Sequence, residues 1–302
     1  MSIDLASKNA DQLSVGFIGC GRLGKALAWG LSDAGLRVTC VSSSMAEDAL
    51  ALVARIPPCQ VTTSQTVVDK CDLVFITTPD SIIEPTASAL RWRAGQAAVH
   101  CSGVTEVSAL DAARASGAFT GGFHPMQTFG DPDAAMKSLP GSTITIEADE
   151  PLNEWLGHFA RKLGCSVNRL PPGMRGRYHA AAGVTSQFIN ALFAEAATLW
   201  ESWGATEESA LRALLPLARG TLSSIESAGI ARGMPGPVSR GDVASIEKHV
   251  EALDGLGPEM MAFYRILCSS TVKLALGNGV IDAATAAQFT AALKAEKPGA
   301  HH

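Results

Sequence analysis

The feature that most constrains the fold is a glycine-rich turn at residues 19–24, which lies between an apolar run and a helical segment. The run Val15–Ile18 is predicted to be a strand, and Lys25–Ala34 has the composition of a helix that ends at Gly35. A second β-rich run, Arg37–Val41, follows at once. A strand, a glycine-rich turn, a helix and a second strand in this order predict a parallel βαβ unit.

The spacing of the glycines in this turn is that of a motif that binds the pyrophosphate of a dinucleotide. Its residues are Gly19, Cys20, Gly21, Arg22, Leu23 and Gly24. The first glycine makes the tight turn, the second lets the pyrophosphate approach the backbone, and the third packs the helix against the strand. The helix N-terminus then offers N–H groups to phosphate. A glycine-rich turn without a ligand is the alternative, and the flanking strands and helix argue against it.

The end of the second predicted strand bears on which dinucleotide binds. NAD-binding chains usually carry Asp or Glu there, which binds the ribose 2′-hydroxyl and repels a 2′-phosphate. Here the strand ends in Ser42, Ser43 and Ser44, and no acidic residue follows until Glu47. Three hydroxyl groups, with Arg22 as a cationic partner, favour NADP. NAD stays open as the alternative, because the serines can simply be solvated in a loop.

Beyond this unit the two halves of the chain have different patterns. Seven β-rich runs in the first half are predicted strands: Ser14–Ile18, Arg37–Ser42, Leu73–Thr77, Ala97–Cys101, Ala118–Phe123, Thr143–Glu147 and Ser166–Leu170. Because helical segments separate them, we expect an α/β fold, a doubly wound and mainly parallel sheet. Pro171-Pro172-Gly173 then breaks the pattern. We expect a dinucleotide-binding domain over residues 1–170 and an all-α domain over residues 171–302.

The second half is almost wholly helical. The predicted helices are Tyr178–Trp203, Glu207–Glu226, Asp242–Leu253, Glu259–Leu276 and Asp282–Lys294. Pro216 is expected to kink or split the second of them. Asp242 and Asp282 stand where N-caps are needed, and Gly277 stands where a C-cap is needed.

Composition limits the kinds of molecule that the protein is expected to bind. The 302 residues carry a net charge of −5, which argues against nucleic acid or an anionic membrane as the main partner. No apolar run reaches the roughly 18 residues of a transmembrane helix, and the first dozen residues lack the regions of a signal peptide. Seven scattered cysteines without a CxxC pair fit reduced thiols, and no short metal-ligand spacing is present. We expect a cytoplasmic protein without a bound metal, whose partner is a small molecule.

Further candidate residues follow the third and fourth predicted strands. In an open parallel sheet, ligands bind beyond the carboxyl ends of the strands. Thr78 and Pro79 are therefore expected along the cofactor, and Ser102 is expected to contact the nicotinamide or the substrate. His100, inside its strand, is better explained as a buried histidine with satisfied hydrogen bonds.

Three segments carry a resemblance to a known group: Gly122–Phe129, Tyr178–Ala182 and Gly236–Asp242. With them, residues 14–270 resemble bacterial proteins that join a Rossmann-like domain to a C-terminal helical domain of unknown function. These proteins belong to the 6-phosphogluconate-dehydrogenase-like superfamily. Because some members are alternative ketopantoate reductases, the resemblance implies an NADPH-dependent reductase of a small, carboxylate-bearing 2-oxo acid.

The chain departs from the pattern of this group at two positions. The serine run after the second strand has Ser43 where the group often has Arg. In the helix that begins near Tyr178, Gln187 stands where an Asn is usual, and Asn190 lies one turn away. Because a longer amide reaches further, the substrate or its pose is expected to differ from that of the group.

The residues of these segments suggest roles in catalysis. The candidates are His124, His179, Gln187, Asn190, Arg240 and Asp242. His124 or His179 would supply a proton near neutral pH, and a substrate carboxylate would bind Arg240. The two amides would hydrogen-bond the reacting group, and Asp242 would either orient Arg240 or only cap its helix. Substrate is expected between the two domains.

Other functions stay open beside this one. An imine-acid reductase of the pyrroline-carboxylate type is the second chemical candidate. A dinucleotide-responsive binding or regulatory protein without turnover is the third hypothesis, and a scaffold for oligomerisation is the fourth. The apolar, alanine-rich segments Tyr178–Trp203 and Glu259–Leu276 predict a two-fold homodimer, although buried core helices would show the same pattern.

Overall fold

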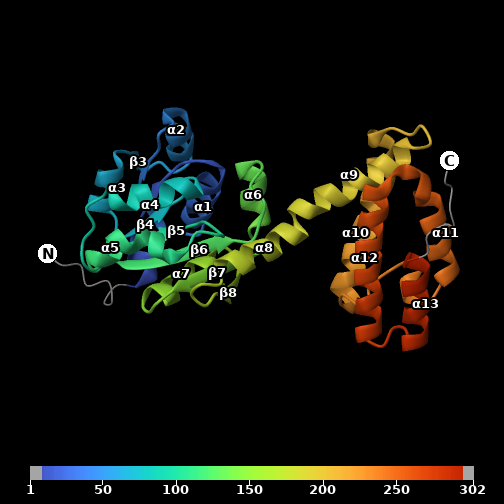
Figure 1. The fold of residues 1–302 in the computed structure, drawn as a ribbon. Helices are drawn as coiled ribbons and strands as arrows, with labels where there is room; N and C mark the ends of the chain where they lie inside the picture. The colour runs from blue at the N-terminus through green and yellow to red at the C-terminus, as the bar shows by residue number, and fades with distance from the viewer. Residues whose placement is uncertain (1–8, 295–302) are drawn as a thin grey trace. The chain divides into compact units, whose positions relative to one another are not determined.

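The computed structural model describes residues 9–294 of the chain. The chain divides into two compact units, Met1–Thr185 and Ser186–His302 (Figure 1). The first contains all of the strands described, and the second is helical. The predicted class, a doubly wound and mainly parallel sheet followed by an all-α region, is confirmed.

One eight-stranded sheet organises the first unit, in the order β3-β2-β1-β4-β5-β6-β7-β8. Its strands are β1 (Ser14–Ile18), β2 (Arg37–Ser42), β3 (Gln60–Val61), β4 (Leu73–Ile76), β5 (Ala97–His100), β6 (Phe119–Pro125), β7 (Thr143–Ala148) and β8 (Ser166–Arg169). All seven predicted strands are present, and the two-residue β3 is additional. Neighbouring strands are parallel except β6 and β7, so β7 and β8 run opposite to the other six.

Helices cover both faces of the sheet. They are α1 (Arg22–Asp33), α2 (Ala46–Ala54), α3 (Ser64–Lys70), α4 (Asp80–Ser88), α5 (Asp111–Ala115), α6 (Pro132–Ser138), α7 (Leu152–Lys162) and α8 (Arg175–Thr185). Apolar residues of α1, α2 and α7 bury one face with Phe17 and Phe75, and those of α3, α4 and α5 bury the other with Val74 and Ile76. Successive strand residues point to opposite faces, so continuously apolar strands belong in this two-sided burial.

Residues 186–294, the described part of the second unit, contain five α-helices. They are α9 (Gln187–Glu201), α10 (Glu207–Ala228), α11 (Val243–Leu253), α12 (Pro258–Gly277) and α13 (Ala283–Lys294). The last three surround a core that includes Ile246, Val272 and Phe289. No helix within residues 9–294 is long and apolar enough to cross a membrane.

The helix boundaries correct several predictions in detail. The predicted helix Tyr178–Trp203 is divided at Ser186 into α8 and α9. Pro216 lies inside α10 without splitting it. The predicted C-cap, Gly277, is the last helical residue instead, because the left-handed conformation falls on Gly279 (φ +67°). The predicted N-caps are confirmed, since Asp242 and Asp282 accept hydrogen bonds from the backbone N–H groups three residues on.

Candidate functional site

The order of the strands reverses at β1, which lies between β2 and β4. In an open α/β sheet such a reversal opens a crevice beyond the carboxyl ends of the strands, where ligands bind. The glycine-rich turn follows β1 and Thr77 follows β4. Both segments that the sequence assigned to cofactor binding therefore lie at this switch point.

The three glycines of the turn have different surroundings, and each position favours glycine for a different geometric reason. Gly19 has φ +103°, and a Cβ there would lie 2.7 Å from the backbone of Thr77. A Cβ on Gly24 would lie 2.4 Å from the carbonyl oxygen of Gly19, so the third glycine permits close packing of α1 on β1. A Cβ on Gly21 would meet no atom within 4 Å. The second glycine therefore faces open space, as the approach of a pyrophosphate requires.

Thr77 and Thr78 complete this cradle. The hydroxyl of Thr77 donates to the carbonyl oxygen of Gly19 over 2.6 Å and holds the turn in place. The buried Oγ1 of Thr78 has no hydrogen-bond partner among the described residues. An unsatisfied buried hydroxyl is rare, and this one lies where the sequence places the cofactor. The exposed Pro79 precedes α4. The residues present therefore fit a bound dinucleotide.

The residues after β2 divide into structural and accessible groups. Ser42 is buried, and its hydroxyl contacts that of Ser64 over 3.0 Å. Ser43 accepts a hydrogen bond from the N–H of Met45, whereas Ser44 is exposed. The guanidinium of Arg22 is exposed and donates to the carbonyl oxygen of Gly130 over 3.3 Å. Ser44 and Arg22 therefore have the side chains most open to a 2′-phosphate.

Cys20 and Leu23 contribute packing to the turn. Both side chains contact the main core of the sheet. Burial raises the pKa of the Cys20 thiol to about 12, so the thiol stays protonated. Their side chains therefore support the turn, while its backbone is the part available to a phosphate.

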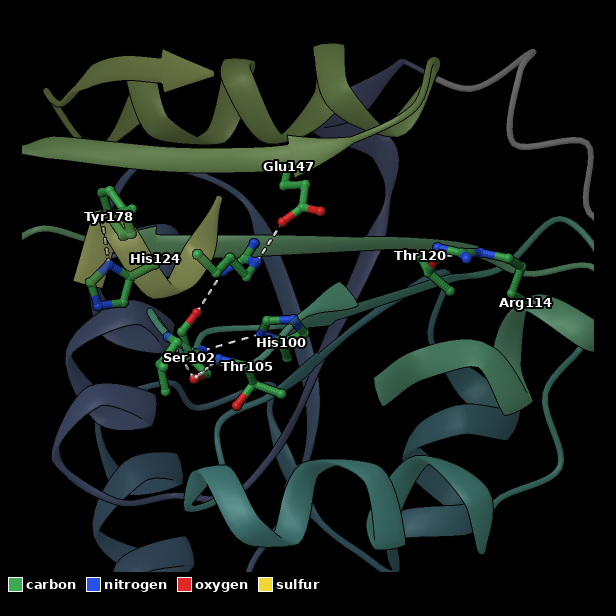
Figure 2. A network of polar contacts seen from close by, with 10 residues as sticks. His100, Ser102, Thr105, Arg114, Thr120, His124, Glu147 and Tyr178 are labelled. Atoms are coloured by element: carbon green, nitrogen blue, oxygen red, sulfur yellow. Dashed lines mark hydrogen bonds and ion pairs between the residues drawn. The ribbon is translucent and has the colours of Figure 1, made fainter. Parts of the chain in front are cut away.

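A cluster of ring side chains lies at the same edge of the sheet. His124, at the end of β6, places its Nδ1 atom 2.7 Å from the hydroxyl of Tyr178 on α8 (Figure 2). The ring of His179, the next residue of α8, lies with its centroid 6.3 Å from that of His124. Gly103, after β5, makes room for both, because a Cβ there would lie 2.6 Å from His179 and 2.9 Å from the Nε2 atom of His124. The structure thus brings together both histidines that the sequence singled out.

Burial controls the charge of this cluster. It lowers the pKa of His124 to about 4, with further electrostatic contributions from His179 and Arg175. Burial raises the pKa of Tyr178, against the lowering effects of Thr145 and Arg175. Near neutral pH the imidazole of His124 is therefore neutral and the phenol keeps its proton. A neutral imidazole bonded at one nitrogen and a protonated phenol form a pair that can donate a proton.

A buried ion pair lies beside the cluster. Arg175, the first residue of α8, is fully buried, and its Nε atom donates to Glu147 on β7 over 2.5 Å. Its Nη1 atom donates to the carbonyl oxygen of Ser102 over 2.8 Å. Burial raises the pKa of Glu147 while the Arg175 charge opposes that rise. A Cβ on Gly122 would lie only 1.7 Å from the Nη2 atom of Arg175, so the guanidinium occupies the space that this glycine leaves free.

His100 and Ser102 shape the loop after β5. The Nδ1 atom of His100 accepts the N–H of Ser102, but its Nε2 atom has no partner among residues 9–294 (Figure 2). The predicted buried histidine is therefore only half satisfied. Burial, followed by the Arg175 charge, lowers the pKa of His100 to about 3. The hydroxyl of Ser102 accepts from the N–H groups of Val104 and Thr105, and whether Ser102 contacts ligands stays a prediction.

The remaining candidates lie in the second unit. The side chain of Asp242 accepts hydrogen bonds from the N–H and the hydroxyl of Ser245, which is the capping role. Arg240 ends a short 3₁₀ turn and is exposed. Gln187 is exposed at the start of α9, and the amide of Asn190 donates to the carbonyl oxygen of Gln187. Their contacts with substrate stay predictions.

Sequence reasoning missed Tyr178, Arg175 and Glu147 as site residues. One signal was available, because Gly121 and Gly122 stand together inside a predicted strand, and glycine there often marks a close approach of another group. Arg175 gave no comparable signal, because the predicted helix began only at Tyr178, whereas α8 begins at Arg175. No group of three or more His, Cys, Asp or Glu side chains within residues 9–294 could hold a metal ion.

The switch point, the glycine turn and the open space beside it define a dinucleotide-binding α/β domain. Two family models match the chain in agreement with this class. The Rossmann-like domain matches residues 4–125, and the domain of unknown function DUF2520 matches residues 142–271. The chain therefore joins a Rossmann-like domain to a DUF2520 domain, the combination that the sequence resemblance implied.

Solved structures share this fold at low sequence identity. A "putative NADP oxidoreductase" from Bacteroides fragilis is 24% identical with a TM-score of 0.69, over 88% of this chain and 100% of its own. A protein from Thermotoga maritima is 21% identical with a TM-score of 0.73, over 88% and 99%. A reductive aminase from Aspergillus terreus, in complex with NADPH and ethyl-5-oxohexanoate, is 16% identical with a TM-score of 0.60, over 93% and 92%. No curated protein matches the chain significantly.

Proposed function

We propose that this protein is an NADPH-dependent reductase of a carbonyl or imine carbon in a small, carboxylate-bearing substrate. The observation that carries the proposal is the position of the His124–Tyr178 pair. The pair lies at the carboxyl edge of the same parallel strands whose switch point holds the glycine turn. A proton-donating pair and a dinucleotide cradle at one edge are the two parts that such a reduction needs.

The chain's own residues supply the proton and its position. NADPH, when bound, supplies the hydride. The oxygen or nitrogen of the reduced group would need one proton, which a residue of this chain would supply. In the proposed arrangement the Tyr178 hydroxyl donates to Nδ1 of His124, which leaves Nε2–H as the donor beside Gly103. The phenol proton replaces the proton lost from Nε2, and the Arg175 charge favours the resulting phenolate.

The substrate class rests on the sequence resemblance. A ketopantoate-like 2-oxo acid is the first candidate, and an imine acid of the pyrroline-carboxylate type is the alternative. Support for NADPH comes from the serines that follow β2 in place of an acidic residue and from the neighbour solved with NADPH. The implied substrate roles of Arg240, Gln187, Asn190, Ser102 and Asp242 belong to this proposal.

We also propose a homodimer built on the helices of the second unit. Large apolar side chains of α9 and α10 are exposed, and with their neighbours they line a groove of about 470 Å³. Its lining includes Leu192, Leu215, Leu217 and Leu222, with Arg219 as the charged residue. A contiguous apolar surface of this kind marks an interaction site, and a second copy of the chain would bury it symmetrically.

The deciding experiment is a titration with NADPH and with NADH, in which nicotinamide fluorescence reports binding. Ketopantoate and then Δ¹-pyrroline carboxylate are added to the same samples, and absorbance at 340 nm is recorded. We expect tighter binding of NADPH than of NADH, and oxidation with one of the two substrate classes. Binding without oxidation by a wider panel of oxo acids and imines would favour the dinucleotide-responsive binding protein. Failure to bind either nucleotide would overturn the reductase.

The proton-donating pair can be tested in the same assay. Tyr178→Phe should lower kcat by about 100-fold, since a general acid contributes 10²–10⁴, and should leave the Kd of NADPH unchanged. Tyr264→Phe is a matched control, because Tyr264 bonds His249 in the second unit through the same atoms over 2.8 Å. Equal kcat values for the two variants would remove Tyr178 from the mechanism.

A further inference from the structure

Arg175 occupies a position that a helix does not favour by itself. It is the first residue of α8, where the partial positive charge of the helix dipole repels a cation. Its side chain is also fully buried, and burying a charge is costly unless the charge is paired. The Glu147 carboxylate bonds its Nε atom and the Ser102 carbonyl oxygen bonds its Nη1 atom, which offsets part of these costs, whereas Nη2 has no partner among residues 9–294.

The sheet is shaped to receive this guanidinium. Gly122 on β6 and Glu147 on β7 are directly opposite each other in the antiparallel register. The guanidinium bonds the second and lies over the first, at a place where any side chain on β6 would collide with its Nη2 atom. One pair of residues, one from each strand, therefore forms the seat of Arg175.

His124, the member of the proton-donating pair that lies in the sheet, is two residues after Gly122 on β6. His124 is directly opposite Thr145. Because side chains alternate along a strand, His124 lies on the same face of β6 as Gly122. On α8, Tyr178 and His179 are three and four residues after Arg175, so all three share one face of the helix. Placing Arg175 over Gly122 therefore aligns Tyr178 with His124.

We propose that Arg175, through its ion pair with Glu147 over Gly122, is the positioning residue that holds Tyr178 and His179 against His124. The inference deepens the proposed function, because it assigns the origin of the geometry on which proton transfer depends. Arg175 contacts neither Tyr178 nor His124 in the hydrogen bonds described, so it acts through the placement of α8. A merely electrostatic role for its charge is the competing explanation.

The two roles of Arg175 predict opposite shifts of the Tyr178 pKa when Arg175 is removed. The groups that face this phenol are His124 on β6, Thr145 on β7 and Arg175 on its own helix. If Arg175 acts only through its charge, its removal raises the pKa of Tyr178 further, because a cation favours the phenolate. If Arg175 positions α8, its removal exposes the phenol to water and returns the pKa to about 10, the ordinary value.

The chain allows this measurement on a single phenol. It contains only two tyrosines, so Tyr264→Phe leaves Tyr178 alone. In that background, the ¹³Cζ resonance of labelled Tyr178 is followed against pH in the protein without substrate or cofactor. We expect Arg175→Met to shift the midpoint downward to about 10. An upward shift or an unchanged midpoint would overturn the positioning role.

A second variant keeps the charge of Arg175 and removes the space over Gly122 that its guanidinium occupies. Gly122→Ala should displace the guanidinium and lower the Tyr178 midpoint, as Arg175→Met does, and an unchanged midpoint would count against the proposal.

Arg114→Met is the matched control, since Arg114 also bonds β6, through Thr120, but lies outside the ion pair. The control midpoint should equal that of the parent, and the same downward shift in the control would also contradict the proposal. Dispersed ¹³C signals and far-UV circular dichroism show that each variant is folded.

Kinetics supply the link to function. Arg175→Met should reduce kcat by about 100-fold, the effect of misplacing a reacting group by roughly 1 Å, with the Kd of NADPH unchanged. Arg175→Lys, which can still reach Glu147, should restore part of the loss. A protein without reductase activity would refute the proposed function and leave the titration as the test of Arg175. Activity together with an upward titration shift would refute only the inference.

Discussion

At the scale of residues, burial decides which side chains at the sheet edge can carry charge. His100 is fully buried and His124 is partly buried, and the pKa of each lies well below the usual value of about 6.5. Both imidazoles also face the fixed positive charge of Arg175, which cannot lose its proton in the physiological range. Neutral histidines here are therefore a consequence of the ion pair and the apolar strands together.

This neutrality predicts how stability depends on pH. In the unfolded chain, His124 would take up a proton below about pH 6.5, whereas in the folded protein it stays neutral down to about pH 4. The unfolded state therefore binds more protons in this window, so the free energy of unfolding falls as pH falls from 6.5 to 4. His124 should account for about 1–2 kcal/mol of the difference between pH 7 and pH 5.

Urea unfolding at the two pH values, followed by tryptophan fluorescence, measures this contribution. His124→Asn keeps a polar group beside Tyr178 but has no proton to gain, so its pH dependence should be smaller by that amount. The exposed His249→Asn in the second unit serves as the control. An identical pH dependence in His124→Asn and in the parent would contradict the assignment.

At the scale of elements, the turn between β1 and α1 combines two requirements in one short motif. Gly19 and Gly24 are needed for the packing of the chain itself, because added Cβ atoms would collide with backbone atoms. Gly21 meets no such limit, and its φ of −66° is accessible to any residue. Two of the glycines therefore serve the fold, and the middle one is free to serve the ligand.

This division predicts different results for two substitutions. Gly24→Ala should destabilise the protein by about 1–3 kcal/mol, the usual effect of overpacking. Gly21→Ala should leave the free energy of unfolding within about 0.5 kcal/mol of the parent and raise the Kd of NADPH at least tenfold. Thermal unfolding and nicotinamide fluorescence measure the two effects. A Gly21→Ala protein that binds NADPH normally would show that the turn does not hold the pyrophosphate.

At the scale of the whole molecule, the two units use their apolar residues differently. The first unit buries both faces of its sheet. In the second unit, α11, α12 and α13 share a core, whereas α9 and α10 each contribute a single buried alanine. Leu217 and Leu222 remain 64% and 58% exposed, which is the surface that the proposed homodimer would cover.

The dimer is tested by light scattering at micromolar protein. We expect a mass twice the 31.3 kDa of the chain, and Leu217→Glu should shift it towards the monomer, because a buried carboxylate opposes apolar association. Leu50→Glu is the matched control, since Leu50 on α2 is exposed to a similar extent, 60%. A monomeric mass for the unsubstituted protein would remove the homodimer.

The sequence by itself determined the features that depend on a few neighbouring residues. Glycine spacing defined the turn after β1, apolar runs defined seven strands, and Asp242 and Asp282 marked helix starts. These features follow from local backbone sterics and from side-chain periodicity, which act over fewer than about ten residues. Residues at the carboxyl edge of the sheet could also be predicted, because parallel strands end on one side. The sequence singled out His124 and His179 as candidate proton donors, and the structure places their rings side by side.

Only the tertiary structure decided the direction of β7 and the contacts that depend on it. A strand of β-branched residues carries no signal for parallel or antiparallel pairing. The antiparallel register places Glu147 opposite Gly122 and Thr145 opposite His124. Arg175 reaches Glu147 across 28 residues of sequence, and Tyr178 reaches His124 across 54. Contacts at such separations depend on how the sheet is assembled, because no local interaction specifies them.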